Sequence, residues 1–403
     1  MIIQIYLQDM LKNLLKILNR IFPISDFLYI LQLEEYESKR YFNRLKRFFW
    51  RRNLEKRDKL VYTTRIKIIL CLALPFILIT PPFTPFWIGL SNLILTPYFS
   101  FIRLKIQKRA SLYFSKVNTK TKIIAVAGSF GKTTTKNYIY ELVKYNYKTQ
   151  MIPGNINTPT GIANWIINNF NPTIEILIVE VDTYFIGEIK RSLKITPPDI
   201  AILTNVGDQH LERFKNKSNL KKALYEVFDY SKPKATKIQN KKTNLEYALE
   251  VAKILKIPDD IIKDTVKKLK PPERRGNITK LNDFDLIDNS YNISETTGIK
   301  SVKNAKEISD RLHKKLIVMT AGIPELGDEN KNGNINLGRV LGKKADVILL
   351  LQSIFSKDVE KGISKNKKII KLEFMRDALD KLKEFDSKKY IILMQPELND
   401  LYY

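Results

Sequence analysis

Cysteine and histidine are almost missing from this 403-residue chain, which has one cysteine, Cys71, and two histidines. A single cysteine cannot build a disulfide framework or a cysteine-based zinc site within one chain, so the sequence favours a reducing compartment. Acidic residues are also scarce, with 42 Asp and Glu against 69 Lys and Arg. The net charge of +27 suits an anionic membrane surface or a phosphorylated substrate, although abundant lysine would raise it without either partner. Nucleic acid is the least favoured partner, because no recognition module accompanies the charge.

Charged residues are missing altogether from residues 68–102, and prolines at positions 81, 82 and 85 divide this stretch. Each half is short for a membrane span of about 20 residues, so we expect a helical hairpin or two tilted spans. Arg65 and Lys67 precede the stretch and Arg103 and Lys105 follow it, which predicts that both ends lie on the cytoplasmic side. The alternative is a buried hairpin in the core of a soluble domain.

The residues around this hairpin are predicted to be helical and basic. Met1–Phe22 has apolar residues at near-helical spacing, interrupted by basic ones, and would lie along a membrane surface or pack on another helix. Positive residues are then dense from Glu34 to Lys67. Residues 1–110 are therefore predicted to form a helical, membrane-associated region.

The stretch Lys122–Thr135, KIIAVAGSFGKTTT, combines a buried-strand pattern, a glycine turn and the start of a helix. Backbone N–H groups and the positive end of a helix would converge there with one ammonium group, which is how proteins cradle phosphates. Lys132 could reach the outer phosphates and Thr133 could bind Mg²⁺. The spacing lacks the first glycine of the common phosphate-loop pattern, because Val126 stands in its place. The candidate nucleotide-binding residues of the turn are Gly128, Ser129, Phe130, Gly131, Lys132, Thr133 and Thr134.

Short apolar runs alternate with helical stretches from Ile123 onward, which predicts α/β structure. We expect a phosphate-loop-type domain with a mostly parallel sheet over residues 111–272 and a smaller Rossmann-like α/β domain over residues 273–403. The expected strands are Ile123–Ala127, Ile174–Val181, Asp199–Thr204, Leu316–Thr320, Val347–Leu351 and Tyr390–Met394. Ligands collect at the carboxyl ends of such strands, so Glu180 and His210 are candidate metal ligands, with Asp182 a weaker one.

Several motifs occur in the order and approximate spacing of a known family. They are GSFGKTTTK, GNINTPTG at 154–161, VEVDTYFIGEI at 179–189, PPDIAILTNVGDQHLERF at 197–214, IDNSYNISETTGIKS at 287–301 and TAGIPELGDE at 320–329. From about Lys120 to Tyr403 the chain thus resembles the central and C-terminal domains of the Mur ligase family. The resemblance is strongest to its members that add D-alanyl-D-alanine to a muramoyl tripeptide.

The resemblance implies an ATP-dependent ligase that forms an amide through an acyl phosphate. The acceptor would be a peptidoglycan precursor or another carboxylate, and the amine donor an amino acid or dipeptide, at the cytoplasmic face of the cell membrane. By the match, Lys132 holds phosphates, Thr133 and Glu180 hold one Mg²⁺, and His210 holds a second. Arg275, or its neighbour Arg274, would approach the phosphates. The remaining implied nucleotide contacts are Asn244, Asp288 and Asn292.

The chain also departs from the family. Leu224 stands where the family carries a carbamylated lysine, two residues before Glu226, and Lys222 is out of register. The basic membrane segment stands in place of the family's UDP-sugar-binding domain, the interval from Phe228 to Asn244 is shorter than in the family, and Phe130 replaces the usual asparagine. The alternative function is therefore a membrane-anchored, catalytically degenerate ATP-binding protein that works by binding a partner.

Overall fold

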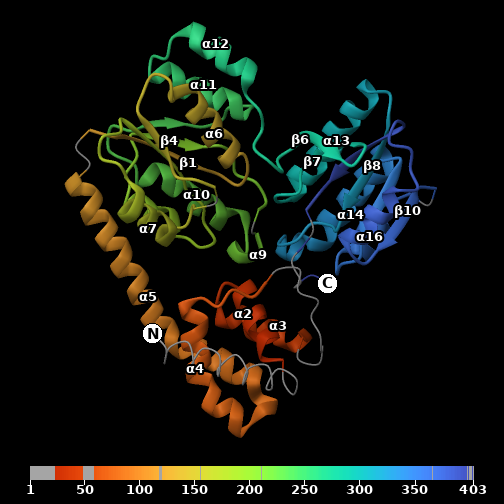
Figure 1. Cartoon of the computed structure of the whole chain (residues 1–403), viewed down its shortest axis with the longest axis horizontal. Helices are drawn as coiled ribbons and strands as arrows, with labels where there is room; N and C mark the ends of the chain where they lie inside the picture. The colour runs from red at the N-terminus through yellow and green to blue at the C-terminus, as the bar shows by residue number, and fades with distance from the viewer. Residues whose placement is uncertain are drawn as a thin grey trace, which may run out of the picture. The chain divides into compact units, whose positions relative to one another are not determined.

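The computed structural model describes residues 23–48, 59–117, 120–154, 156–209, 211–364, 366–396, 398 and 402. It divides the chain into two compact units (Figure 1). The helical unit comprises Met1–Leu104 with Leu398–Tyr403, and the α/β unit comprises Lys105–Glu397. The expected helix Met1–Phe22 and the candidate ligand His210 lie outside the described residues.

The helical unit contains the two arms of the expected hairpin. Its elements are α2 (Ile24–Leu33), α3 (Ser38–Phe48), α4 (Thr64–Ile79), the 3-10 turn η1 (Pro81–Phe83) and the first part of α5 (Thr84–Val117). α4 begins where the Thr63 hydroxyl accepts a hydrogen bond from the Ile66 N–H, and it ends before the two prolines of η1. α5 continues beyond the uncharged stretch into the α/β unit. By length and composition alone, Pro81–Val117 is the one described helical segment that could cross a membrane.

Glu34 ties the helical unit together from the end of α2. Its side chain is fully buried, and its two carboxylate oxygens each accept a hydrogen bond at 2.6 Å, from Arg40 Nε and Arg44 Nε of α3. A buried carboxylate needs such partners, because its desolvation is otherwise uncompensated. The Arg44 guanidinium also lies 5.3 Å from the ring centre of Tyr402, which is buried. Residues far apart in the sequence therefore complete one unit.

Replacing Glu34 by alanine is expected to destabilise the α2–α3 pair by about 3 kcal/mol, because two arginines lose the charge they surround. Hydrogen exchange of α2 and α3 in the full chain measures the loss. Glu37→Ala is the control: Glu37 is more exposed and lies 3.8 Å from Arg40, so we expect less than about 1 kcal/mol. Equal protection of the α2 and α3 amides from hydrogen exchange in the two variants would contradict the stabilising role of Glu34.

The first sheet of the α/β unit has the order β2-β3-β1-β4-β5, with all four neighbouring pairs parallel. Its strands are β1 (Lys122–Ala127), β2 (Thr149–Met151), β3 (Ile176–Glu180), β4 (Ile200–Leu203) and β5 (Thr236–Ile238). Its helices are α6 (Lys132–Val143), α7 (Pro159–Asn169), α8 (Glu188–Leu193), α9 (Leu211–Phe214), α10 (Lys217–Asp229), α11 (Asn244–Ile254) and α12 (Asp259–Lys268).

Both faces of this sheet are covered, which explains why its strands read as continuous apolar runs. Ile124 and Val126 of β1 face a core shared with α6, α11 and α12. Ile123 and Ala125 face the opposite core, to which α7, α8, α10 and the end of α5 contribute. Figure 1 shows the two helical layers on either side of β1 and β4.

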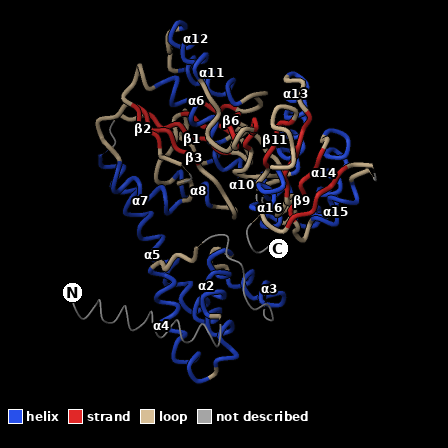
Figure 2. Tube along the Cα trace, turned by 45° about the vertical axis from the view of Figure 1, so that its right-hand side comes forward, coloured by secondary structure: helices blue, strands red, loops and turns tan. Residues whose placement is uncertain are grey.

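The second sheet has the order β10-β9-β8-β11-β7-β6, with β6 and β7 antiparallel and the other pairs parallel. Its strands are β6 (Asn277–Leu281), β7 (Phe284–Asp288), β8 (Lys315–Thr320), β9 (Val347–Leu351), β10 (Lys368–Leu372) and β11 (Tyr390–Met394). Its helical segments are α13 (Glu295–Arg311), η2 (Gly327–Glu329), α14 (Asn330–Lys344), α15 (Ser356–Gly362) and α16 (Met375–Leu382). One face packs on α13, α14 and α15 and the other on α16, a layering that the strands and helices of Figure 2 display.

The predicted fold class is confirmed: the chain has a parallel α/β sheet followed by a second, C-terminal sheet. The expected strands occur with small differences at their ends, and Val347–Leu351 and Tyr390–Met394 match residue for residue. β2, β5, β6, β7 and β10 were not among the predicted strands. The membrane association of the helical unit stays a prediction.

Candidate active site

The glycine turn connects β1 to α6, as predicted, and neighbouring elements press closely against it. Gly128 and Gly131 have φ angles of +142° and +83°, which favour glycine. A Cβ on Gly128 would lie 2.0 Å from the Thr204 hydroxyl oxygen after β4. A Cβ on Gly131 would lie 2.4 Å from the side-chain oxygen of Asn244, the first residue of α11. Both glycines are therefore required by conformation and by space.

The loop after β4 holds the turn in one conformation. The Phe130 N–H donates to Asn205 Oδ1 at 3.1 Å, and Asn205 Nδ2 donates to the Phe130 carbonyl at 2.9 Å. The Gly207 N–H donates to Ser129 Oγ at 2.9 Å. The Phe130 ring covers Gly207, where a Cβ would lie 2.4 Å from a ring carbon. The phenylalanine that replaces the family's asparagine thus fixes the turn by packing.

Lys132 begins α6 and folds its ammonium group back into the turn. Its Nζ donates to the Gly128 carbonyl at 2.7 Å and lies 3.2 Å from a carboxylate oxygen of Asp182. The side chain is 7% exposed, so this charge is held at the turn rather than in solvent. Thr134, two residues further along α6, is buried.

Glu180 ends β3 beside the turn and is 3% exposed. Its Oε2 accepts a hydrogen bond from the Thr133 hydroxyl at 2.9 Å, and its Oε1 accepts one from Asn157 Nδ2 at 3.4 Å. Within the described ranges, no three His, Cys, Asp or Glu residues form a metal-binding cluster. Mg²⁺ is commonly held by one or two carboxylates together with substrate phosphates, so Thr133 and Glu180 fit a nucleotide-bound magnesium ion.

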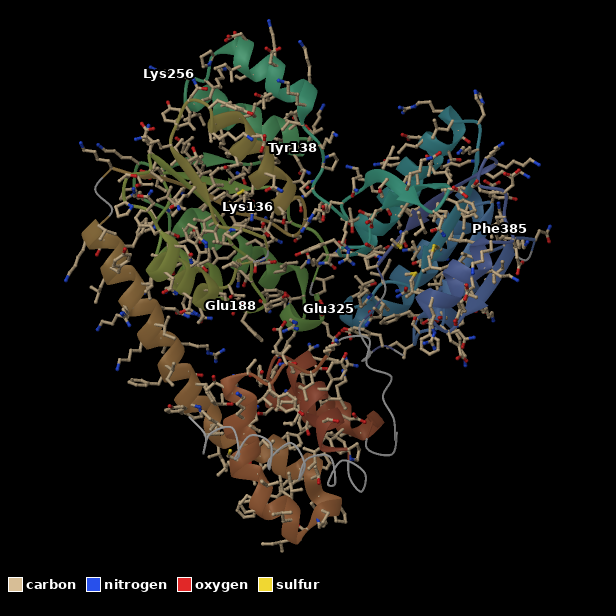
Figure 3. The ribbon with its side chains drawn as sticks, viewed as in Figure 1. Lys136, Tyr138, Glu188, Lys256, Glu325 and Phe385 are labelled. Carbon is tan, nitrogen blue, oxygen red and sulfur yellow. The ribbon has the colours of Figure 1, made fainter. Side chains whose placement is uncertain are left out.

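Lys136, labelled in Figure 3, is a residue of the candidate site that was not predicted from the sequence. Its ammonium group lies 3.3 Å from Glu180 Oε2 and donates to the carbonyls of Ile152 and Gly154, each at 3.0 Å. Burial lowers the pKa of Lys136, and the nearby Glu180 charge opposes that shift. The sequence feature that could have identified Lys136 is its position four residues after Lys132. On a helix this spacing places both side chains on the same face of α6.

Arg275 reaches the glycine turn from the second lobe of the α/β unit, by which we mean residues 273–396 around the second sheet. Its guanidinium donates to the Thr133 hydroxyl at 2.9 Å and stacks 3.9 Å from the ring centre of Tyr291. Arg274 instead donates to the Ser290 side chain at 2.9 Å. Of these two neighbouring arginines, Arg275 is therefore the one that reaches Thr133 at the turn, while Arg274 bonds to Ser290.

Two implied nucleotide contacts, Asp288 at the end of β7 and Asn292 in the segment that follows, bond to residues near them in the sequence. Asp288 accepts hydrogen bonds from the N–H and hydroxyl of Ser290, and Asn292 accepts one from the Ile293 N–H. A further contact between the lobes, also missed from sequence, is made by Asp208, whose Oδ2 accepts a hydrogen bond from the Thr296 N–H at the start of α13. The described structure therefore groups Lys132, Thr133, Glu180, Asn244 and Arg275, while Asp288 and Asn292 make contacts within their own loop.

The position at which the resemblance implies a carbamylated lysine is apolar and closed. Leu224 is 1% exposed within the core against the first sheet, and Lys222 is exposed on the other side of α10. Glu226 accepts hydrogen bonds from the N–H groups of Gly187 and Lys190 at 2.6 and 3.0 Å. Its carboxylate therefore caps α8, where negative charge is favourable.

A cavity of about 440 Å³ opens beside the turn at the carboxyl ends of β4 and β5. Thr204 and Asn205 line this cavity, and both also donate hydrogen bonds to the Phe130 carbonyl in the glycine turn. It is lined by Leu203, Thr204, Asn205, Val206, Lys221, Tyr225, Gln239, Asn240, Lys241 and Tyr247. Aromatic, amide and ammonium groups therefore surround a space next to the glycine turn.

Comparison with known proteins agrees with this geometry. Residues 126–276 match the family described as the Mur ligase middle domain. Over this segment, the chain is similar to the Mur ligase family. The segment contains Lys132, Glu180 and Arg275, so the predicted resemblance is confirmed for the part of the chain that carries the turn.

The curated relatives are similar over a limited part of their length. A UDP-N-acetylmuramoyl-tripeptide–D-alanyl-D-alanine ligase of Borreliella burgdorferi is 36% identical over 110 residues, which are 27% of this chain and 23% of the relative. The enzyme of the same description from Bacillus subtilis is 29% identical over 124 residues, 31% of this chain and 26% of the relative. The aligned segment thus spans about a quarter of these Mur ligases.

Solved structures extend the likeness in fold. A MurF ligase from Thermotoga maritima, in complex with ADP, superposes with a TM-score of 0.64 at 23% identity, covering 73% of this chain and 80% of that chain. A MurF structure from Acinetobacter baumannii gives 0.64 at 19% identity, with 73% and 77% covered. At these identities the likeness concerns the fold.

Alanine at Gly131 is expected to lower nucleotide affinity at least about tenfold, a loss of about 1.4 kcal/mol. The new Cβ would displace Asn244 and distort the turn. Gly187→Ala is the control, because Gly187 also has a positive φ, +96°, but a Cβ there would meet its nearest atom at 3.8 Å. Calorimetric titration with Mg-ATP and Mg-GTP measures the nucleotide affinity of both variants. Equal affinities for the Gly131 and Gly187 variants would show that the space beside Asn244 is unimportant for binding.

Proposed function

We propose that this Mur ligase family member is an ATP-dependent ligase that joins a carboxylate to an amine. The observation that carries the proposal is the convergence of Lys132, Thr133, Glu180 and Arg275 at one turn. Two cationic side chains, the backbone N–H groups at a helix start and a buried carboxylate next to a hydroxyl are groups that stabilise phosphoryl transfer. The matched segment and its D-alanyl-D-alanine-adding relatives favour a peptidoglycan precursor as the acceptor.

The nucleotide would lie with its phosphates on the glycine turn and its base towards the cavity lined by Tyr225, Asn240 and Tyr247. Lys132 would exchange its contact with Asp182 for the phosphates, and Arg275 would add positive charge from the second lobe. Thr133 and Glu180 would hold a magnesium ion, which neutralises phosphate charge when bound. The chain's own groups thereby orient the terminal phosphate and offset its charge.

The reaction proposed has two steps. An oxygen of the acceptor carboxylate forms a bond to the γ-phosphorus while the bond from that phosphorus to the β–γ bridging oxygen breaks, which leaves ADP and an acyl phosphate. The amine nitrogen then bonds to the acyl carbon, the carbon–oxygen bond to phosphate breaks, and the nitrogen loses a proton. The products are an amide, ADP and inorganic phosphate.

The full chain is expected to bind Mg-ATP, and Lys132→Ala to weaken that binding about 10- to 100-fold. The estimate follows from about 1.5–3 kcal/mol for a hydrogen bond to a charged group. Lys144→Ala is the matched control, because Lys144 lies at the other end of α6 and pairs with Glu141. Unchanged affinity in the Lys132 variant would contradict both this function and the alternative below.

One observation favours a second candidate function, an ATP-binding protein that has lost ligation. The buried Leu224 cannot supply the metal-bridging group that the family's carbamylated lysine provides, and Lys222 lies exposed outside that position. The chain would then bind ATP and act through a partner.

Phosphate release separates the two functions. Full chain with Mg-ATP, muramoyl peptides and D-alanyl-D-alanine should release phosphate and form a new amide, detected by mass spectrometry. The Lys132→Ala variant supplies the background rate. Binding of ATP with no amide on any acceptor would favour the degenerate protein.

The membrane location is the remaining part of the proposal. We infer that the helical unit binds the cytoplasmic face of the cell membrane, which would keep the ligase next to precursors assembled there. The support comes from the uncharged stretch 68–102 and from basic residues at both of its ends.

A further inference from the structure

The α4–α5 hairpin has one covered and one uncovered side. Ile69, Ala73 and Ile77 of α4 are buried, as are Ile88 and Asn92 of α5. The opposite sides of both helices are exposed and apolar. They present Leu72, Phe76 and Ile79 on α4, Phe83 in η1, and Phe86, Leu93, Ile94, Phe101 and Leu104 on α5. An apolar surface of this extent on two adjoining helices marks an interaction site.

The connection between the arms is suited to hydrocarbon rather than to water. Pro81 and Pro82 bring no N–H groups, and the N–H groups of Thr80 and Phe83 donate to the carbonyls of Phe76 and Thr80. The Thr80 hydroxyl accepts a hydrogen bond from the Trp87 indole at 2.8 Å. Among the large apolar side chains beside the turn, Ile79 is the most exposed, at 78%. A turn with internally satisfied polar groups and an apolar tip can enter a membrane at low cost.

The shorter arm cannot reach across a bilayer. Lys67 is exposed near the start of α4, and Ile79 at the tip lies twelve positions after it. At 1.5 Å per residue this arm is about 18 Å long, whereas the hydrocarbon core is about 30 Å thick. If Lys67 stays among the headgroups, the tip ends inside the bilayer.

α3 sets a second limit, because it lies along the covered side of α5. Asn92 Nδ2 donates to the Ser38 hydroxyl, and the Tyr41 hydroxyl donates to the Pro85 carbonyl near the tip. The free side of α3 carries exposed Lys39 and Lys46. A hairpin that crossed the membrane would draw these lysines into the hydrocarbon, where charge is disfavoured.

We propose that the hairpin is a monotopic anchor, which enters one leaflet of an anionic phospholipid bilayer and does not cross it. Its uncovered apolar residues lie among the acyl chains, and Lys67, Arg103 and Lys105 at its open end lie among the headgroups. Complementary charge selects the lipid surface over a protein partner, because basic residues flank the apolar surface at both ends. The inference rests on the membrane location proposed above and is independent of the ligase chemistry.

Sided labelling tests the anchor in the full chain. In a Cys71→Ser background, which removes the chain's only cysteine, Ile79→Cys places one thiol at the tip. The variant is expressed in cells, and spheroplasts are treated with a membrane-impermeant maleimide before and after detergent. The protein should stay in the carbonate-washed membrane fraction and be labelled only after detergent. Labelling of intact spheroplasts would show a spanning hairpin, and protein in the soluble fraction would show no anchor; each overturns the proposal.

Charge reversal gives a second measurement that does not depend on the tip variant. Lys67→Glu with Lys105→Glu should weaken binding to vesicles of phosphatidylcholine and phosphatidylglycerol at least about tenfold, from about 1 kcal/mol per basic residue near the surface. Lys267→Glu with Lys383→Glu changes the charge equally on exposed residues of the α/β unit. Equal losses in both pairs would contradict headgroup contact. Mg-ATP binding, measured on the same samples, reports separately on the ligase proposal.

Discussion

The burial of one carboxylate governs the arrangement of the candidate site. Glu180 ends a central strand with 3% of its surface exposed, so its charge must be matched from within the protein. Lys136 supplies an ammonium group, Thr133 a hydroxyl and Asn157 an amide. Lys136 also bonds to the carbonyls of Ile152 and Gly154. The carboxylate thereby ties together α6, the end of β3 and the segment after β2.

The need to match buried charges within the protein also applies to Lys132 in the glycine turn. The Lys132 ammonium group donates to the Gly128 carbonyl and pairs with Asp182, so its charge is matched within the turn. Arg275 joins this network from the second lobe through Thr133. The Lys132 ammonium group is thereby already directed at the turn, where a phosphate ligand would replace its contact with Asp182.

Much of this architecture could be predicted, because buried parallel strands read as apolar runs and the turn has a distinctive glycine spacing. β1, β9 and β11 were accessible in this way. β2 and β5 were not, since three residues carry too little periodicity. The partners of Glu180 within the site, Lys136 and Asn157, come from separate segments and meet only in the fold. Leu224 was recognised as a departure, but only the structure shows it packed in a core and Glu226 used to cap α8.

The burial of Leu398 and Tyr402 in the helical unit has a consequence for biogenesis. Most of that unit is translated first, yet these two residues leave the ribosome only after all of the α/β unit has been made. Until then the ring beside Arg44 is missing, and the apolar hairpin must persist in an unfinished helical unit. The helical unit can therefore complete its fold only after the α/β unit that interrupts it in the sequence has been translated.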